Sequence, residues 1–127
     1  MKKQGSVSLW VGNTKSVDDL NEFLKITYDE DGDLIPSRFA RAFKTGRYDD
    51  FCREAKFFEQ PLSGLNELSK GFSYYDIIMP KFEEFAIKIK DPFNSVIFLY
   101  NFEYDEKLKH YDNGTFSFDY IGSVEYE

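Results

Sequence analysis

The stretch Asn94-Ser-Val-Ile-Phe-Leu-Tyr-Asn-Phe-Glu-Tyr104 decides the fold, because it is the longest strand-like run in the chain and the most apolar. At a period of two, one face carries mostly aromatic residues and the other carries aliphatic ones: Val96, Phe98, Tyr100, Phe102 and Tyr104 against Ile97 and Leu99. Apolar residues on both faces of the first half indicate an interior strand of a sheet, covered on both sides. Asn101 and Glu103 make the second half one-sided, so we expect one face to reach water there.

The remaining segments alternate between strand and helix patterns. Strand patterns are expected at residues 7–11, 55–59 and 116–126, and Asp112-Asn-Gly114 predicts a hairpin turn before the last of them. Helix patterns begin at Ser16 and Ser37, and two more cover residues 63–71 and 78–89, the last with Pro80 either in its first turn or at a kink. This order predicts an α+β fold, with an antiparallel or mixed sheet, about four helices packed mainly on one face, and a C-terminal β-meander.

Composition limits the classes of function. The length of 127 residues predicts a single domain over residues 1–127, and the 14 Phe can supply its core. A formal net charge of -7 argues against nucleic-acid binding and favours a basic protein partner. The single Cys52 favours weakly a reducing compartment. Neither a signal peptide nor a membrane-spanning run is recognisable, so a cytoplasmic protein without membrane attachment is expected.

Residues suited to catalysis are few. Cys52 and His110 are the only residues of their kinds, so cysteine and histidine cannot form a zinc site, and a Cys–His nucleophile pair has no supporting motif. Phosphate-binding loops and the nucleophile elbow are missing from the sequence. Trp10 is expected to pack beneath a helix rather than to form a ligand platform. We therefore expect a cofactor-free binding module rather than an enzyme.

The turn Tyr28-Asp-Glu-Asp-Gly-Asp33 is the most acidic segment of the chain. Placing Gly32 at the sixth position of a calcium-binding loop puts Arg38 at the twelfth, where a bidentate glutamate is required. The turn is therefore expected to be a solvated acidic turn or a donor of carboxylates to Lys or Arg of a partner.

Tyrosines beside carboxylates are typical of protein-binding surfaces. Together with the acidic turn, they give the predicted partner-binding residues: Asp29, Glu30, Asp31, Asp33, Tyr48, Asp49, Asp50, Tyr74 and Tyr75.

Several stretches in this order are familiar. They are Val7-Ser-Leu-Trp-Val-Gly-Asn13, the acidic turn followed by Ile35-Pro-Ser37, Lys70-Gly-Phe-Ser-Tyr74, Ile78-Met-Pro-Lys-Phe82, the opening stretch, and Phe118-Asp-Tyr-Ile-Gly-Ser-Val-Glu-Tyr126. Together they resemble the immunity protein 22 family over nearly the whole chain. The resemblance implies an immunity protein of a bacterial polymorphic toxin system, which binds and silences a toxin domain encoded by a neighbouring gene. It carries over no catalytic residues.

Three hypotheses about function remain. As an immunity protein, the chain would bind its toxin, expected to be a nuclease, either over the basic active cleft or at an exosite. As a small hydrolase, it would use carboxylates such as Asp29, Asp31 and Glu103. As a calcium-dependent module, it would use the acidic turn.

Overall fold

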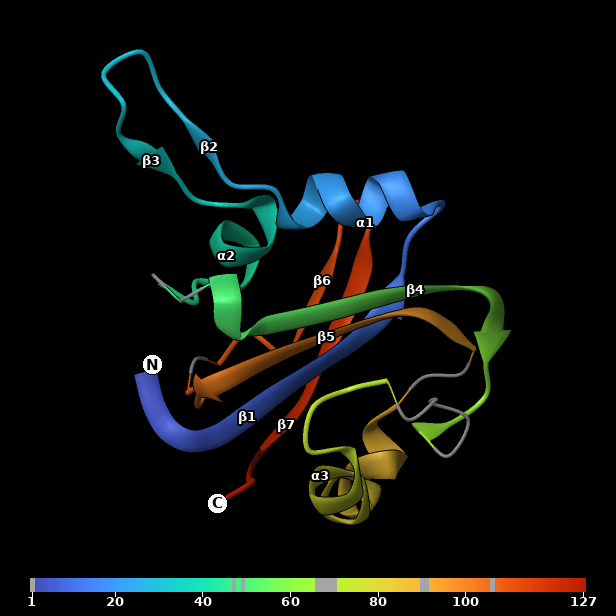
Figure 1. The fold of residues 1–127 in the computed structure, drawn as a ribbon. Coiled ribbons are helices and arrows are strands. Elements are labelled where there is room, and N and C mark those ends of the chain that lie inside the picture. Colours follow the sequence, from blue (N-terminus) through green and yellow to red (C-terminus); the bar gives the residue numbers. More distant parts are fainter. Residues whose placement is uncertain (1, 47, 49, 66–70, 90–91, 106) are drawn as a thin grey trace.

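The fold is a five-stranded antiparallel sheet with helices on both faces (Figure 1). The computed structural model describes residues 2–46, 48, 50–65, 71–89, 92–105 and 107–127. Its elements are β1 (Lys2–Asn13), α1 (Val17–Leu24), β2 (Thr27–Tyr28), β3 (Leu34–Ile35), α2 (Arg38–Phe43), η1 (Asp50–Cys52), β4 (Arg53–Leu62), α3 (Tyr75–Phe82), η3 (Glu83–Lys88), β5 (Phe93–Phe102), β6 (His110–Asp112) and β7 (Ser117–Glu125). The α+β class is as predicted.

The strand order β4-β5-β1-β7-β6 places the first strand of the chain in the middle of the sheet. The opening stretch forms β5, which is an interior strand as predicted, but β1 rather than β5 occupies the central position. Because β1 lies between β5 and β7, the last three strands do not form the predicted meander, and only β6 and β7 form a hairpin. β4 extends beyond the predicted residues 55–59 and forms one edge of the sheet.

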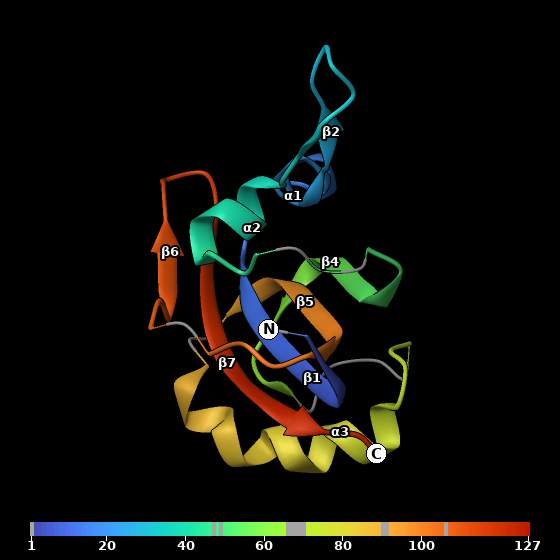
Figure 2. The same cartoon turned by 90° about the vertical axis from the view of Figure 1, so that its left-hand side faces the viewer.

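Helices cover both faces of the sheet, so the prediction that they pack mainly on one face was wrong (Figure 2). The alternation of β1 divides its side chains between two cores. Val7, Leu9 and Val11 pack with α3, whereas the fully buried Trp10 packs with α1 and α2. Trp10 therefore lies beneath helices, as predicted.

The period of two breaks inside β5 at Asn101. This residue has a φ of 58°, in the left-handed region that asparagine tolerates better than most residues. Tyr100 pairs with Val7, but Phe102 pairs with Lys2, so the register slips at this point. Phe102 and Tyr104 thus enter the core beneath α1 and α2, and the predicted common face of residues 96–104 was wrong.

A second irregularity divides β7. Trp10 pairs with Tyr120 and Leu9 with Gly122, which leaves Ile121 as the extra residue of a β-bulge. Residues before the bulge pack beneath α1 and α2, and those after it pack against the core of α3. Ser117, Asp119 and Ser123 are half-buried and Glu125 is exposed, so the strand is partly solvated, as the alternation of its sequence indicates.

Local signals placed the first two helices correctly. The Ser16 hydroxyl accepts a hydrogen bond from the backbone N–H of Asp19 at 3.2 Å, and Ser37 accepts one from Ala40 at 3.1 Å. α2 ends at Phe43, and its C-cap residue, Lys44, has a φ of 54°, in the left-handed region. Pro80 lies inside α3.

The described part of the chain contains three α-helices instead of about four. The helix expected over residues 63–71 falls largely on residues 66–70, outside the described residues. No helix among those described is long and apolar enough to cross a membrane.

Candidate functional site

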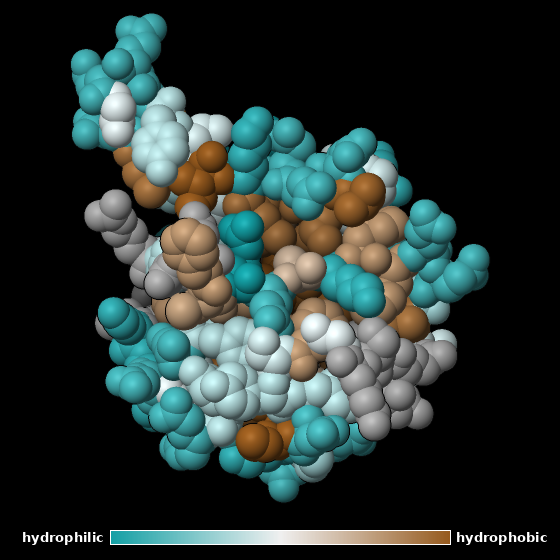
Figure 3. All heavy atoms as spheres, viewed as in Figure 1, coloured by the Kyte–Doolittle hydropathy of each residue, from teal (hydrophilic) through white to brown (hydrophobic). Residues whose placement is uncertain are grey.

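Residues 27–35 form a hairpin that projects from the body of the molecule, and we call it the acidic arm (Figure 1). β2 and β3 pair only through Thr27 with Ile35 and Tyr28 with Leu34. Four predicted binding residues lie on this arm and all are exposed: Asp29, Glu30, Asp31 and Asp33. Figure 3 shows the arm as a hydrophilic projection above a more hydrophobic area of the body.

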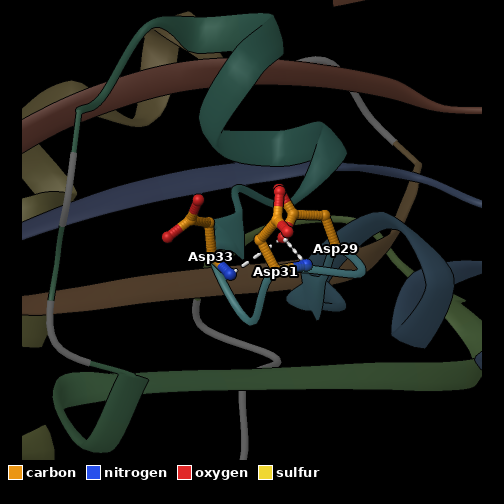
Figure 4. Close-up of side chains that lie close together, drawn as sticks. All are labelled: Asp29, Asp31 and Asp33. Atoms are coloured by element: carbon orange, nitrogen blue, oxygen red, sulfur yellow. Dashed lines mark hydrogen bonds between the residues drawn. The ribbon is translucent and has the colours of Figure 1, made fainter.

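Asp29 builds the turn of the arm (Figure 4). Its Oδ1 accepts hydrogen bonds from the backbone N–H groups of Asp31 and Asp33, each at 2.9 Å. Its own backbone N–H donates to the carbonyl of Asp33 at 2.9 Å, and Gly32 adopts a φ of 83° to close the loop. Asp29 therefore shapes the arm as well as contributing charge.

The turn gathers three carboxylates. One oxygen from each of Asp29, Asp31 and Asp33 lies within 4.8 Å of the others. Like charges at this separation repel, and a cationic group placed among them relieves the repulsion. Arg38, which stands where a calcium loop needs its glutamate, lies instead in the first turn of α2. The arrangement suits a guanidinium or ammonium group of a partner.

Of the predicted residues at positions 48–50, the structure describes Tyr48 and Asp50, and both follow α2 outside the arm. Tyr48 is half-buried, and its ring centroid lies 6.1 Å from that of Phe39 and 6.5 Å from that of Phe102. Its hydroxyl accepts a hydrogen bond from Arg53 at 3.4 Å. Tyr48 thus supports the fold at this point. Asp49 lies outside the described residues, and Asp50 begins η1.

Tyr74 and Tyr75 lie far from the arm, at the start of α3, so the structure does not bring all the predicted residues together (Figure 1). Tyr74 is 50% exposed and has a φ of 59°, whereas Tyr75 is half-buried against the core. The Tyr74 ring centroid lies 4.4 Å from that of Tyr126 and 6.2 Å from that of Tyr100.

The Tyr100 hydroxyl is held inside this tyrosine cluster, where it donates to the carbonyl of Ser73 at 2.7 Å. Burial, and next the negative charge of Glu54, raise the pKa of Tyr100 far above its ordinary value. Glu54 also accepts hydrogen bonds from the backbone N–H and the hydroxyl of Ser73, at 2.9 and 2.6 Å. The start of β4 is therefore tied to the segment that presents Tyr74.

Glu103 does not join Asp29 and Asp31, the other carboxylates considered for a hydrolase. Glu103 forms an ion pair with Lys3 at 3.0 Å, while Asp29 and Asp31 project on the arm. A groove of about 510 Å³ runs between α1 and β4, but its lining includes a single carboxylate: Asn21, Glu22, Leu24, Lys25, Ile26, Arg53 and Ala55. This groove lacks the paired acid and base that such a reaction needs.

Cys52 and His110 do not form a nucleophile pair. The Cys52 thiol accepts a hydrogen bond from the Asn101 amide at 3.8 Å, next to one edge strand of the sheet. His110 lies on β6, the opposite edge strand, where its Nδ1 is 2.8 Å from Asp119. The two side chains are thus separated by the width of the sheet.

The sequence reasoning overlooked one exposed residue, Phe51. This side chain is 98% exposed on η1, beside the base of the arm. A lone phenylalanine at the end of the polar run Arg47-Tyr-Asp-Asp-Phe51 was the available signal. Phenylalanine is usually a core residue, so the sequence alone did not indicate that Phe51 is exposed.

Comparison with known proteins gives one family. The family model described as Immunity protein 22 matches residues 7–127. No curated protein and no solved structure matches the chain.

Proposed function

Because the chain belongs to the immunity protein 22 family, we propose that it binds a toxin domain encoded beside its own gene and neutralises it by protein–protein contact. The single observation that carries the mode of binding is the gathering of three carboxylates within 4.8 Å at the tip of the projecting acidic arm. The inhibitor acts by occupying a surface of the toxin and performs no reaction itself.

The arm supports contact with a basic toxin surface. Its negative charges lie on a projection and therefore act at the leading edge of an approaching partner. The net charge of -7 adds a field of the same sign, which accelerates association with a positively charged partner. A nuclease fits this description, because its active cleft must be basic to hold phosphates. The arm would then enter the cleft and occupy the place of the substrate backbone.

The test begins with the toxin gene next to the gene for this chain. Co-expression should restore growth to cells that produce the toxin, and the two proteins should purify as a complex. Association with an inactive toxin variant is then measured by surface plasmon resonance at several salt concentrations. Absence of a complex with that toxin would overturn the proposal.

The arm is tested by reversing two charges that do not build its turn. The double variant Asp31→Lys and Asp33→Lys should lower the association rate about tenfold and flatten its salt dependence. The matched control, Glu83→Lys and Glu84→Lys, makes the same change in net charge at exposed positions of η3, away from the arm. Equal effects of the two double variants would show that net charge, and not the arm, steers the toxin.

A further inference from the structure

Phe51 is the most exposed large apolar side chain in the described part of the chain, at 98% exposure. It lies on η1, between the acidic arm and the segment that presents Tyr74 (Figure 1). An exposed phenylalanine adds no core packing, and in a binding partner it is worth most when it fills a pocket at the centre of an interface.

Two described residues near Phe51, Tyr48 and Arg53, contact the body of the molecule. Before it, Tyr48 packs against Phe39 and Phe102. After it, the Arg53 guanidinium donates to the carbonyl of Leu24 at 2.9 Å, which joins the start of β4 to the end of α1. Because Arg53 follows Phe51 by two residues, this bond limits the movement of the backbone on that side and lowers the conformational entropy lost on binding.

The neighbourhood of Phe51 has the composition of an interface centre. Cys52 is half-buried against the core and contacts Asn101, whose amide oxygen accepts from the hydroxyl of Tyr126. Tyr126 packs against the half-exposed Tyr74, so a second accessible aromatic ring lies on this side of the molecule. Glu54 provides negative charge next to the segment that presents Tyr74, and the arm provides it on the opposite side of Phe51. Aromatic anchors inside a charged rim are typical of tight protein–protein contacts.

We propose that Phe51 is the apolar anchor of the toxin-binding surface and inserts into a pocket of the toxin that lies beside its basic residues. This inference rests on the proposed function and assigns different roles in binding to the acidic arm and to Phe51. The acidic arm governs how fast the complex forms, because charge acts at long range. Phe51 governs how long the complex lasts, because its burial is lost only on dissociation. We assign a basic toxin domain as the partner of this surface because the acidic arm is negatively charged.

The experiment measures association and dissociation separately, by surface plasmon resonance with the inactive toxin domain immobilised. Phe51→Ala should raise the dissociation rate about 30-fold or more and leave the association rate within about threefold of wild type. The dissociation rate of Phe51→Leu, which keeps an apolar side chain, should lie between those of the wild type and of Phe51→Ala. Unchanged thermal unfolding, expected because the side chain is 98% exposed, confirms that the variants are folded.

The matched control is Leu108→Ala. This residue is also exposed, at 38%, but it precedes β6 at the opposite edge of the sheet. It should leave both rates unchanged. A normal dissociation rate for Phe51→Ala would overturn this inference alone, because the wild-type complex and the effect of the arm variant would still stand. Failure of the wild-type chain to bind would overturn the proposed function and this inference together. Sedimentation of the free chain as a dimer that Phe51→Ala dissociates would assign the anchor to a second copy and overturn the inference.

Discussion

Replacing Gly12 by alanine should destabilise the fold strongly, because β1 runs through the middle of the sheet. A Cβ at this position would lie 2.0 Å from the carbonyl oxygen of Ser117 and 2.6 Å from the ring of Phe118, which is fully buried. Relieving the overlap requires β1 and β7 to separate locally. Two ladder hydrogen bonds at about 1 kcal/mol each and about 1–3 kcal/mol of overpacking, less about 0.5–1 kcal/mol of chain entropy, give a loss of about 2–4 kcal/mol.

Equilibrium unfolding in urea measures this loss directly. The matched control is Gly122→Ala on β7, where the nearest atoms are those of the half-buried Phe85 ring, at 3.2 Å. That ring can move by a few tenths of an ångström, so the control should change the free energy of unfolding by less than about 1 kcal/mol. If Gly12→Ala loses no more stability than Gly122→Ala, the close approach of β1 and β7 is not what requires glycine.

Two further predictions concern the arm and the tyrosine cluster. Asp29→Ala should open the turn and lower the hydrogen-exchange protection of the Asp31 and Asp33 amides by about tenfold. Asp29→Asn keeps an acceptor oxygen and should lower this protection less. Equal protection in both variants would contradict the role of Asp29 in the turn. Because burial raises the pKa of Tyr100, the folded chain keeps the phenol proton where the unfolded chain loses it. The contribution of Tyr100 to stability should be full below about pH 10 and fall above it by up to about 1.4 kcal/mol per pH unit, in addition to any fall from Tyr120 and Tyr126, whose pKa values burial also raises. Tyr100→Phe should remove this part of the fall in urea titrations between roughly pH 8 and pH 11; an unchanged slope would contradict the assignment.

Local signals were sufficient for the parts of the fold that depend on neighbours in sequence. Ser16 and Ser37 cap helices because a hydroxyl at that position can reach the third backbone N–H. The turn at Asp112-Asn-Gly114 forms because Gly114 adopts a φ of 90°. The apolar run on both faces of β5 correctly indicated an interior strand.

The errors arose where strict alternation fails. A period of two assumes a regular strand, and one irregular residue moves every later side chain to the other face. Asn101 and the bulge at Ile121 both do this. Neither leaves a clear mark in the sequence, so the two cores were merged into one and the helices were placed on one face.

The exposure of the candidate site residues was predicted in part for a similar reason. Charge marks an exposed segment directly, and the four acidic residues of the arm are exposed as their composition indicated. Exposure of an aromatic residue depends on tertiary packing, which alternation and composition do not report. Tyr48 is consequently half-buried, while Phe51 is almost fully exposed.

Trp10 gives the chain an internal optical probe. It is the only tryptophan, it is fully buried, and its ring centroid lies 4.9 Å from that of Phe39 and 5.9 Å from that of Phe43, both on α2. The acidic arm leads directly into α2, since β3 ends at Ile35 and α2 begins at Arg38. The fluorescence of Trp10 therefore reports, without any label, whether α2 stays packed on the sheet or is displaced when a partner binds the arm.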